Sequence, residues 1–272
     1  MNTTEIGILG TLRSKIEGNE VVLPGTKLRT IMAILAYRAG DTVASDVLVE
    51  ELGLDRTSTN AANALQAHVS RLRRWLCAHN SAPNLLETTN SGYRLNLDRS
   101  QVDAHLFADQ AEQAIALAPA APSVVATMLE DALKLWRGDA MLDVIDGPLA
   151  ATIADELKFL RATAREVLLE AWLTLGNDHK VIVNARAYAA EDPLNERLWE
   201  SQIIALRRLG RHAQAVDCYN RARKTLRDEL GIQPGGRLRA AVGDEVRPAK
   251  RESGFGEASA RTTDRIGARI AV

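Results

Sequence analysis

The pattern of the sequence changes at about residue 100, and this change restricts the possible folds more than any other feature. Before it, short strand-like runs alternate with short helical runs, separated by Gly, Asn and Ser. From Val102 to about residue 246, strand signals almost disappear and alanine-rich amphipathic helices follow one another. The 272 residues are therefore expected to form two domains of different class.

The first 98 residues predict a mixed α/β unit with a characteristic order of elements. The expected elements are two short strands within 5–23 around a Gly18-Asn19 turn, a helix over 26–39, an extended piece at 42–44, a helix from its N-cap Ser45 to Gly53, a helix containing 63–76, and a β-hairpin over 85–97. Strands, three helices and a closing hairpin are typical of a winged helix-turn-helix.

The helix over 63–76, "NALQAHVSRLRRWL", has one apolar stripe and one nitrogen-rich side. Leucine and valine recur at steps of four, three and four, so at about 100° per residue they lie within about 40° of Leu65. The polar side chains opposite or flanking this stripe are Asn60, Asn63, Gln66, Ser70, Arg71 and Arg74. Arg side chains pair with guanine, and Asn and Gln side chains pair with adenine. Because an α-helix fits the major groove, we expect this side of the helix to contact DNA.

A basic, solvated helix face that only confers solubility is the alternative explanation for these residues. Two neighbouring features favour DNA binding over it. The helix follows a turn and another short helix, and it precedes a hairpin with Gly92, Tyr93 and Arg94 that is placed to reach an adjacent groove. We therefore expect a DNA-binding winged helix-turn-helix.

The second part of the chain predicts stacked helix pairs. Leu175-Gly176 and Leu209-Gly210 are separated by 34 residues, and Trp172 aligns with Leu206 in the same register. A period of about 34 residues with Leu-Gly at the end of the first helix suggests tetratricopeptide-like stacking. The last residues, 247–272, are polar and rich in Gly and Ser, which predicts a flexible tail.

Charge is distributed unevenly along the chain. The net charge is −1, but residues 1–100 carry +1, residues 101–245 carry −5 and residues 246–272 carry +3. A nucleic-acid contact must therefore be a local basic patch. The sequence has no secretory signal, no apolar run of about 18 residues and only two cysteines, so we expect a cytoplasmic protein that does not enter a membrane.

The sequence offers no pattern typical of an enzyme or of a cofactor site. The histidines are scattered, the glycines after residue 230 lack the spacing of a phosphate loop, and no nucleophile lies beside a base. We expect no metal and no cofactor. Trp136, Trp172, Trp199 and Tyr219 stand at helical spacing in apolar stripes and are expected in the core, although a groove for a small-molecule effector stays open as an alternative.

Several segments resemble the Streptomyces antibiotic regulatory protein (SARP) family. The first part resembles its OmpR/PhoB-type winged helix and the second its bacterial transcriptional activator domain. The segments that carry the resemblance are "ILGTL", "KLRTIMAILA", "NALQAHVSRLRRWL", "GYRL", "VDAHLF", "ALKLWRGDAM", "EDPLNERLWESQIIALRRLGRHAQAVDCYNRAR" and "LRDELGIQPG". The resemblance implies a winged helix-turn-helix over 1–98, an all-helical domain over 99–246 and a tail over 247–272.

The resemblance also implies a function. Members of the family bind direct repeats in promoters as side-by-side protomers, a dimer on DNA, and recruit RNA polymerase to a secondary-metabolite (antibiotic) gene cluster. The implied DNA-contacting residues are Asn60, Asn63, Gln66, His68, Ser70, Arg71 and Arg74 on the recognition helix, Thr88, Thr89 and Arg94 in the wing, and Lys27 and Arg29 at the start of the first helix. The loop Asp55, Arg56, Thr57, Ser58 and Thr59 matches the position that contacts the polymerase sigma factor.

Two other functions stay open at this point. One is a helical-repeat scaffold that binds proteins and uses the first domain as an adaptor, suggested by the repeated Leu-Gly pair. The other is a repressor that occupies the same DNA sites, since sequence recognition alone does not set the direction of regulation.

Overall fold

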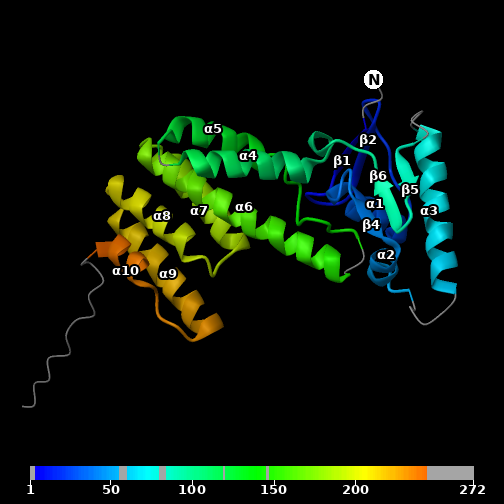
Figure 1. Cartoon of the computed structure of the whole chain (residues 1–272). Helices are drawn as coiled ribbons and strands as arrows, with labels where there is room; N and C mark the ends of the chain where they lie inside the picture. Colours follow the sequence, from blue (N-terminus) through cyan, green and yellow to red (C-terminus); the bar gives the residue numbers. More distant parts are fainter. Residues whose placement is uncertain (1–3, 55–59, 80–83, 119, 145–146, 244–272) are drawn as a thin grey trace, which may run out of the picture.

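The computed structural model describes residues 4–54, 60–79, 84–118, 120–144 and 147–243, and these form two regions of different class (Figure 1). The winged-helix region, residues 4–97, combines two small sheets with three helices, and the helical region, residues 99–243, consists of helices and their connections. The predicted mixed fold class, a winged helix-turn-helix followed by an all-helical tetratricopeptide-like region, is confirmed.

The bounds of the elements are as follows. The winged-helix region contains β1 (Thr4–Gly7), β2 (Arg13–Ile16), β3 (Asn19–Glu20), α1 (Thr26–Tyr37), β4 (Thr42–Ala44), α2 (Ser45–Glu51), α3 (Asn60–His79), β5 (Leu86–Thr88) and β6 (Gly92–Leu95). The helical region contains a short 3-10 helix (Arg99–Gln101), α4 (Asp103–Leu117), α5 (Pro122–Leu133), α6 (Pro148–Thr174), α7 (Asp178–Glu191), α8 (Glu196–Arg208), α9 (His212–Leu230) and α10 (Gly236–Val242).

The first sheet differs from the sequence prediction in strand number and turn position. It is antiparallel with the order β1-β2-β3, so residues 5–23 contribute three strands where two were predicted. Ile16 pairs with Asn19, which makes Glu17 and Gly18 the turn residues, with φ of 50° and 82°. Positive φ at both turn residues suits a tight hairpin. The predicted Gly18-Asn19 turn is therefore wrong by one residue. Strand β3 was not predicted because two residues are too few to show an alternation of apolar and polar side chains.

The second sheet contains the wing and also corrects the predicted start of α2. β5 and β6 form the predicted hairpin, and β6 pairs with β4 on its other side. Ala44, opposite Gly92, is the N-cap of α2, and the Ser45 backbone N–H donates to the Ser91 carbonyl. Ser45 is thus the first helical residue and not the predicted N-cap, because the chain passes directly from β4 into the helix. A Cβ at Gly92 would collide with the Val43 carbonyl, which explains glycine there.

The helical region stacks its helices in antiparallel pairs, as the 34-residue period predicted (Figure 1). Gly176 and Gly210 follow α6 and α8 with φ of 72° and 71°, a left-handed conformation that glycine adopts without a steric cost. Trp172 and Leu206, the aligned pair before these turns, are both buried. The two Leu-Gly repeats therefore end the first helix of two successive helix pairs.

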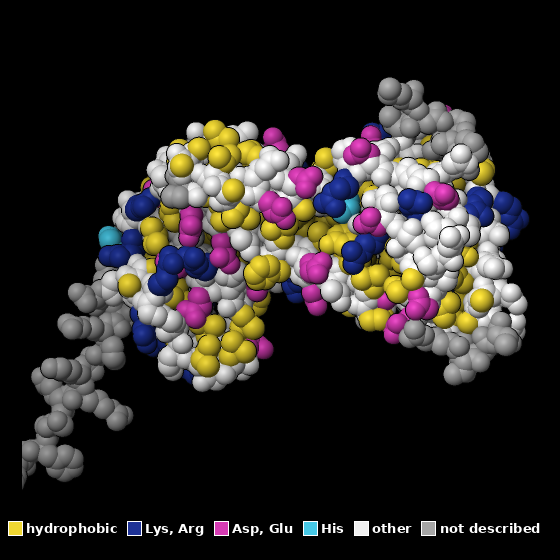
Figure 2. Space-filling view, viewed as in Figure 1, with side chains coloured by type: hydrophobic (Ala, Val, Ile, Leu, Met, Phe, Trp, Pro, Cys, Tyr) yellow, Lys and Arg dark blue, Asp and Glu magenta, His cyan; other side chains and the backbone are white. Residues whose placement is uncertain are grey.

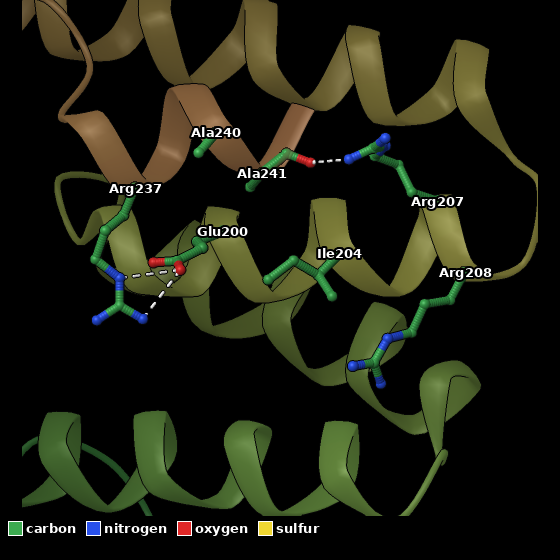
Figure 3. A pocket seen from close by; sticks show the side chains of 7 residues that line it. All are labelled: Glu200, Ile204, Arg207, Arg208, Arg237, Ala240 and Ala241. Carbon is green, nitrogen blue, oxygen red and sulfur yellow. Dashed lines mark hydrogen bonds and ion pairs between the residues drawn. The ribbon is translucent and has the colours of Figure 1, made fainter. Parts of the chain in front are cut away.

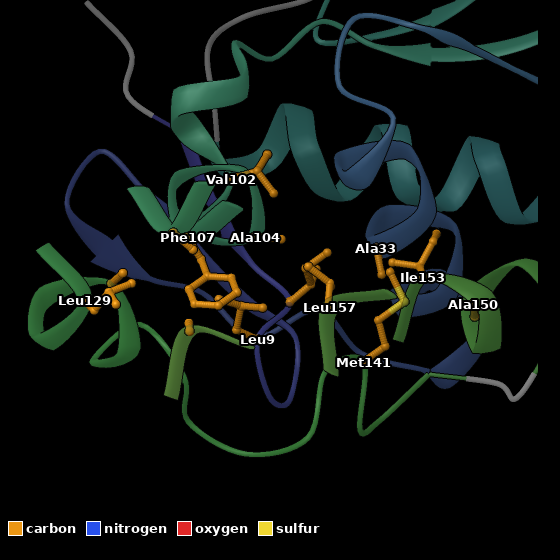
Figure 4. Packing of buried hydrophobic residues seen from close by; sticks show 14 of the residues in the cluster. Leu9, Ala33, Val102, Ala104, Phe107, Leu129, Met141, Ala150, Ile153 and Leu157 are labelled. Carbon is orange, nitrogen blue, oxygen red and sulfur yellow. The ribbon is translucent and has the colours of Figure 1, made fainter. Parts of the chain in front are cut away.

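The two regions share one apolar core. Leu9 and Ala33 from the winged-helix region and Phe107 from α4 are fully buried, and they pack in the same cluster as Ile153 and Leu157 from α6 (Figure 4). The start of α6 also contacts α1 and α2. Burial of apolar side chains from both regions in one core couples their positions.

Charged side chains complete this junction. The Asp103 carboxylate accepts the backbone N–H of Ile8 at 2.7 Å and pairs with Arg137 at 2.9 Å. Burial raises the pKa of Asp103, and these hydrogen bonds and the Arg137 charge oppose that rise. Glu51, only 1 % exposed, accepts the first backbone N–H groups of α6, those of Leu149 and Ala150. A carboxylate is favoured there because the amino end of a helix is electropositive.

Candidate nucleic-acid interface

Helix α3 places its apolar stripe inside the winged-helix region and its polar side at the surface. Leu65, Val69, Leu72 and Leu76 are at most 2 % exposed and pack towards α1 and α2. On the opposite side, all six predicted polar residues are exposed: Asn60, Asn63, Gln66, Ser70, Arg71 and Arg74. Figure 1 shows α3 at the edge of the molecule, at the far end from α7–α9. The helix can therefore be approached by a large ligand along its outer side.

Four of these outer side chains are available for a ligand. Asn63, Gln66, Ser70 and Arg74 make no side-chain hydrogen bond or ion pair with the residues that the structure describes. Arg71 is held within α3, since its Nε donates to the Ala67 carbonyl at 3.2 Å and its Nη2 lies 3.2 Å from His68 Nδ1. An amide, a hydroxyl and a guanidinium group without protein partners are suited to base edges and phosphates.

The outer side of α3 is also electropositive. Arg71, Arg73 and Arg74 form no ion pair with a carboxylate in the described part of the chain. Figure 2 shows Lys and Arg side chains on the upper part of the edge where α3 lies. Burial lowers the pKa of His68, and the charges of Arg71 and Lys27 lower it further. The half-buried Lys27, at the start of α1, therefore lies close enough to α3 to add to the same positive field.

The wing is fastened to α3 by one arginine. Arg73 donates from Nε and Nη2 to the Leu86 carbonyl, at 3.3 and 3.2 Å, and from Nη2 to the Thr88 hydroxyl at 3.0 Å. The sequence pattern of the helix did not reveal this role of Arg73. Its partners are 13 and 15 residues away, in strand β5. No local sequence pattern shows that this strand lies close to α3.

The predicted wing residues are partly engaged by the protein itself. Thr88 is exposed and accepts from Arg73, whereas the Thr89 hydroxyl accepts the Gly92 backbone N–H at 3.1 Å and holds the hairpin turn. Arg94 is half-buried, pairs with Glu87 at 3.4 Å and keeps a buried Nε without a partner among the described residues.

Arg29, expected at a phosphate, belongs to the junction between the two regions. Its Nε lies 2.9 Å from the Asp143 carboxylate and donates to the Asp143 backbone carbonyl, and its Nη1 donates to the Leu23 carbonyl. A guanidinium held by a carboxylate is largely neutralised. Lys27 thus lies near α3, whereas Arg29 faces the helical region. The predicted polymerase-contacting loop, residues 55–59, lies outside the described residues.

The described residues contain few features that would suit another chemistry. Among them, no group of three or more His, Cys, Asp and Glu side chains could hold a metal ion. No described helix is both long and apolar enough to cross a membrane. Trp172, Trp199 and Tyr219 are buried in the helical core, and Trp136 packs edge-on against Phe107 with ring centroids 5.2 Å apart, so these aromatic residues stabilise the fold.

Two family models match the chain, one in each region. Residues 18–95 match the C-terminal domain of transcriptional regulatory proteins, and residues 102–247 match the bacterial transcriptional activator domain. The second match alone spans more than half of the chain, and the boundary between the two matches lies where the winged-helix region meets the helical region.

The chain is similar to regulatory proteins from Streptomyces and Mycobacterium. The chain is 37 % identical to the transcriptional regulator RedD of Streptomyces coelicolor over 238 residues, which cover 86 % of this chain and 68 % of RedD. It is 32 % identical to the regulatory protein DnrI of Streptomyces peucetius, with 86 % of this chain and 89 % of DnrI covered. A solved structure of Mycobacterium tuberculosis EmbR in complex with a low-affinity phosphopeptide superposes with a TM-score of 0.80 at 28 % identity, covering 89 % of this chain and 64 % of EmbR. The chain belongs to the Streptomyces antibiotic regulatory protein family of transcriptional regulators.

Proposed function

We propose that this protein binds promoter DNA in a sequence-specific manner and activates transcription of a secondary-metabolite gene cluster. The observation that carries the proposal is the outer side of α3, where Asn63, Gln66, Ser70 and Arg74 are exposed and without partners among the described residues. In the proposed complex, α3 lies in the major groove. The early residues Asn63 and Gln66 face base edges, and the later residues Arg71 and Arg74 face phosphates. Asn60, His68 and Thr88 flank this surface.

The test is a DNA titration with matched single variants of the full chain. The probe is a duplex from the region adjoining the protein's own gene, measured at several salt concentrations. Arg74→Ala should weaken binding to all sequences and reduce the slope of log K against log salt by about 1. Asn63→Ala should cost about 1–3 kcal/mol on the cognate duplex and relax discrimination at one base pair.

The control for these variants is Arg223→Ala. Arg223 is an exposed arginine of α9 without a partner in the described part of the chain. Helix α9 lies at the end of the molecule away from α3 (Figure 1). The Arg223→Ala variant should bind DNA as wild type does. If both α3 variants also titrate like wild type at every salt concentration, the assignment of this surface is wrong.

The proposed activator binds direct repeats as side-by-side protomers and recruits RNA polymerase. A duplex with two repeats should bind two protomers cooperatively, and a duplex with one repeat should bind one protomer more weakly. Run-off transcription with purified polymerase separates activation from repression, since a repressor would lower transcript yield on the same template. The family relationship to regulators such as RedD and DnrI supports activation.

The loop 55–59 is proposed as the contact with the polymerase sigma factor. It joins α2 to α3 in sequence and lies outside the described residues. Replacing Asp55 and Arg56 by Ala should reduce run-off transcription while DNA affinity stays within about twofold of wild type. A parallel loss of DNA affinity would instead place these residues in the DNA contact.

A further inference from the structure

A second basic surface lies in the helical region, far from α3. It is a groove of about 660 Å³ formed by α7, α8 and α9, and Gln202 and Leu206 of α8 are among its lining residues. Four cationic side chains line it: Arg186, Arg211, Arg221 and Lys224. Asp217 is the one acidic residue among the lining residues, so the groove carries an excess of positive charge within a part of the chain that is acidic as a whole.

None of the four cations has a carboxylate partner in the described part of the chain. All four are exposed, and Arg221 lies over the Trp199 ring, with its guanidinium carbon 5.8 Å from the ring centroid. Other arginines of the same helices are paired, for example Arg197 with Glu170 at 3.1 Å and Arg208 with Asp178 at 3.6 Å. Unpaired cations that converge on one concavity form a local positive potential that attracts anionic ligands.

A neighbouring hollow shows how arginines of α8 and α10 are satisfied by partners within the protein. It has a volume of about 570 Å³ and lies between α8 and α10 (Figure 3). There Arg237 pairs with Glu200 at 3.1 Å, and Arg207 donates to the Ala241 carbonyl at 3.0 Å. The α7–α9 groove differs from this hollow because, among the described residues, no carboxylate or backbone carbonyl pairs with its cations.

The lining residue Gln202 adds a further donor to the groove. Gln202 is only 3 % exposed, and its Oε1 accepts from the Cys218 thiol at 3.2 Å. Its amide nitrogen makes no hydrogen bond with another described residue. With the oxygen already engaged, the amide N–H groups of Gln202 remain as donors for a carboxylate bound in the groove.

We propose that the α7–α9 groove binds an acidic peptide segment of a protein partner. Glutamate or aspartate side chains would pair with Arg186, Arg211, Arg221 and Lys224, and a carboxylate or backbone carbonyl would accept from Gln202. The exposed cations and the apolar Leu206 suit an extended chain with alternating acidic and apolar residues.

Two other occupants fit the groove less well. Residues 246–272 of this chain carry six basic and three acidic residues, so their net charge has the same sign as the groove. A duplex held by α3 lies at the opposite end of the molecule from α7–α9 (Figure 1). The proposal is independent of the role of α3, and its failure would leave the proposed DNA contact intact.

The test measures binding of a fluorescein-labelled decaglutamate peptide to the full chain by fluorescence anisotropy. Wild type should bind the peptide, and its affinity should fall as salt increases. The double variant Arg186→Glu and Lys224→Glu should weaken binding by at least about tenfold, because it reverses two charges that face the ligand. A decaglutamine peptide should not bind.

Two control variants make the result specific to the groove. Arg223→Glu reverses an exposed α9 charge outside the groove lining and should leave peptide affinity within about twofold of wild type. Arg71→Ala with Arg74→Ala should also leave it unchanged, since these residues belong to α3. Circular dichroism checks that each variant folds. The proposal is overturned if wild type does not bind decaglutamate, or if all variants bind it equally. It is also overturned if the groove variant loses affinity for duplex DNA instead of the peptide.

Discussion

Glu51 combines burial, charge and long-range contact in a single side chain. It lies in α2, is 1 % exposed, and accepts the backbone N–H groups of Leu149 and Ala150, 98 and 99 residues further along the chain. Gly147 lies against it so closely that a Cβ there would collide with the carboxylate. The carboxylate thus serves as the cap of a helix in the other region, and the glycine makes room for it.

Replacing Glu51 by Gln should destabilise the whole chain. The glutamine keeps the shape of the side chain, but it loses the charge and directs an amide N–H₂ towards backbone N–H donors. We expect the free energy of unfolding to fall by about 2 kcal/mol, measured by urea denaturation. Glu112→Gln, on the exposed side of α4, is the control and should change it by less than about 0.5 kcal/mol. An unchanged midpoint for Glu51→Gln would show that this cap does not contribute to folding.

At the scale of elements, α3 and the wing act together through Arg73. The guanidinium group bridges α3 to the Leu86 carbonyl and the Thr88 hydroxyl of β5. Trp75 of α3 also donates from its indole nitrogen to the Val22 carbonyl at 3.3 Å, which attaches the helix to the chain after β3. Both contacts leave the outer polar side of α3 uncovered while they fix the orientation of the helix.

Arg73 and Arg74 should therefore behave differently when each is replaced by Ala. Arg73→Ala leaves the Leu86 carbonyl without its donor, so we expect a loss of about 1 kcal/mol in stability and weaker DNA binding with an unchanged salt slope. Arg74→Ala should instead keep the stability and lower the salt slope by about 1. Thermal unfolding combined with DNA titrations at several salt concentrations measures both effects. A reduced salt slope for Arg73→Ala would mean that its guanidinium contacts phosphate.

The elements that the sequence predicted well are those whose signal is local. The apolar stripe Leu65, Val69, Leu72 and Leu76 follows from helix periodicity alone, and the Gly176 and Gly210 turns follow from a repeated Leu-Gly pair. Ser45 failed as a predicted N-cap because the pairing of Ala44 with β6, almost 50 residues away, decides where the helix begins. The contacts of Arg29 with Asp143 had no sequence signal, because this partner too is distant along the chain.

At the scale of the whole molecule, the winged-helix and helical regions are held in a fixed relation. Their shared core contains Leu9 and Phe107 (Figure 4). The Arg137 guanidinium also donates to the Thr11 carbonyl at 2.8 Å across the junction. A ligand bound at α3 therefore sets the orientation of the helical region and of its basic groove as well. Because of this rigidity, a protein bound to DNA through α3 would hold the α7–α9 groove in a defined direction.

His105 is a buried titratable side chain at this junction. It is buried between α4 and α1, stacks on Tyr37 with ring centroids 5.5 Å apart, and its Nε2 donates to the Tyr37 carbonyl at 2.9 Å. Burial lowers the pKa of His105 below its ordinary value of 6.5, and the nearby Arg99 charge lowers it further. The hydrogen bond to Tyr37 and the Asp109 charge oppose this shift without reversing it.

Protonation of His105 should accordingly reduce the stability of the folded chain as the medium becomes acidic. Because the pKa is lower in the folded state, the unfolded state binds the proton first as pH falls through about 6.5, and stability declines until the pH passes the lowered folded value. His105→Gln keeps a donor for the Tyr37 carbonyl but does not titrate, so its melting temperature should fall less than that of wild type between pH 7.5 and pH 5.5. His179→Gln, at an exposed position of α7, should follow wild type. If His105→Gln and wild type lose the same number of degrees over this interval, protonation of His105 is not coupled to the junction, and another group sets the pH dependence of the fold.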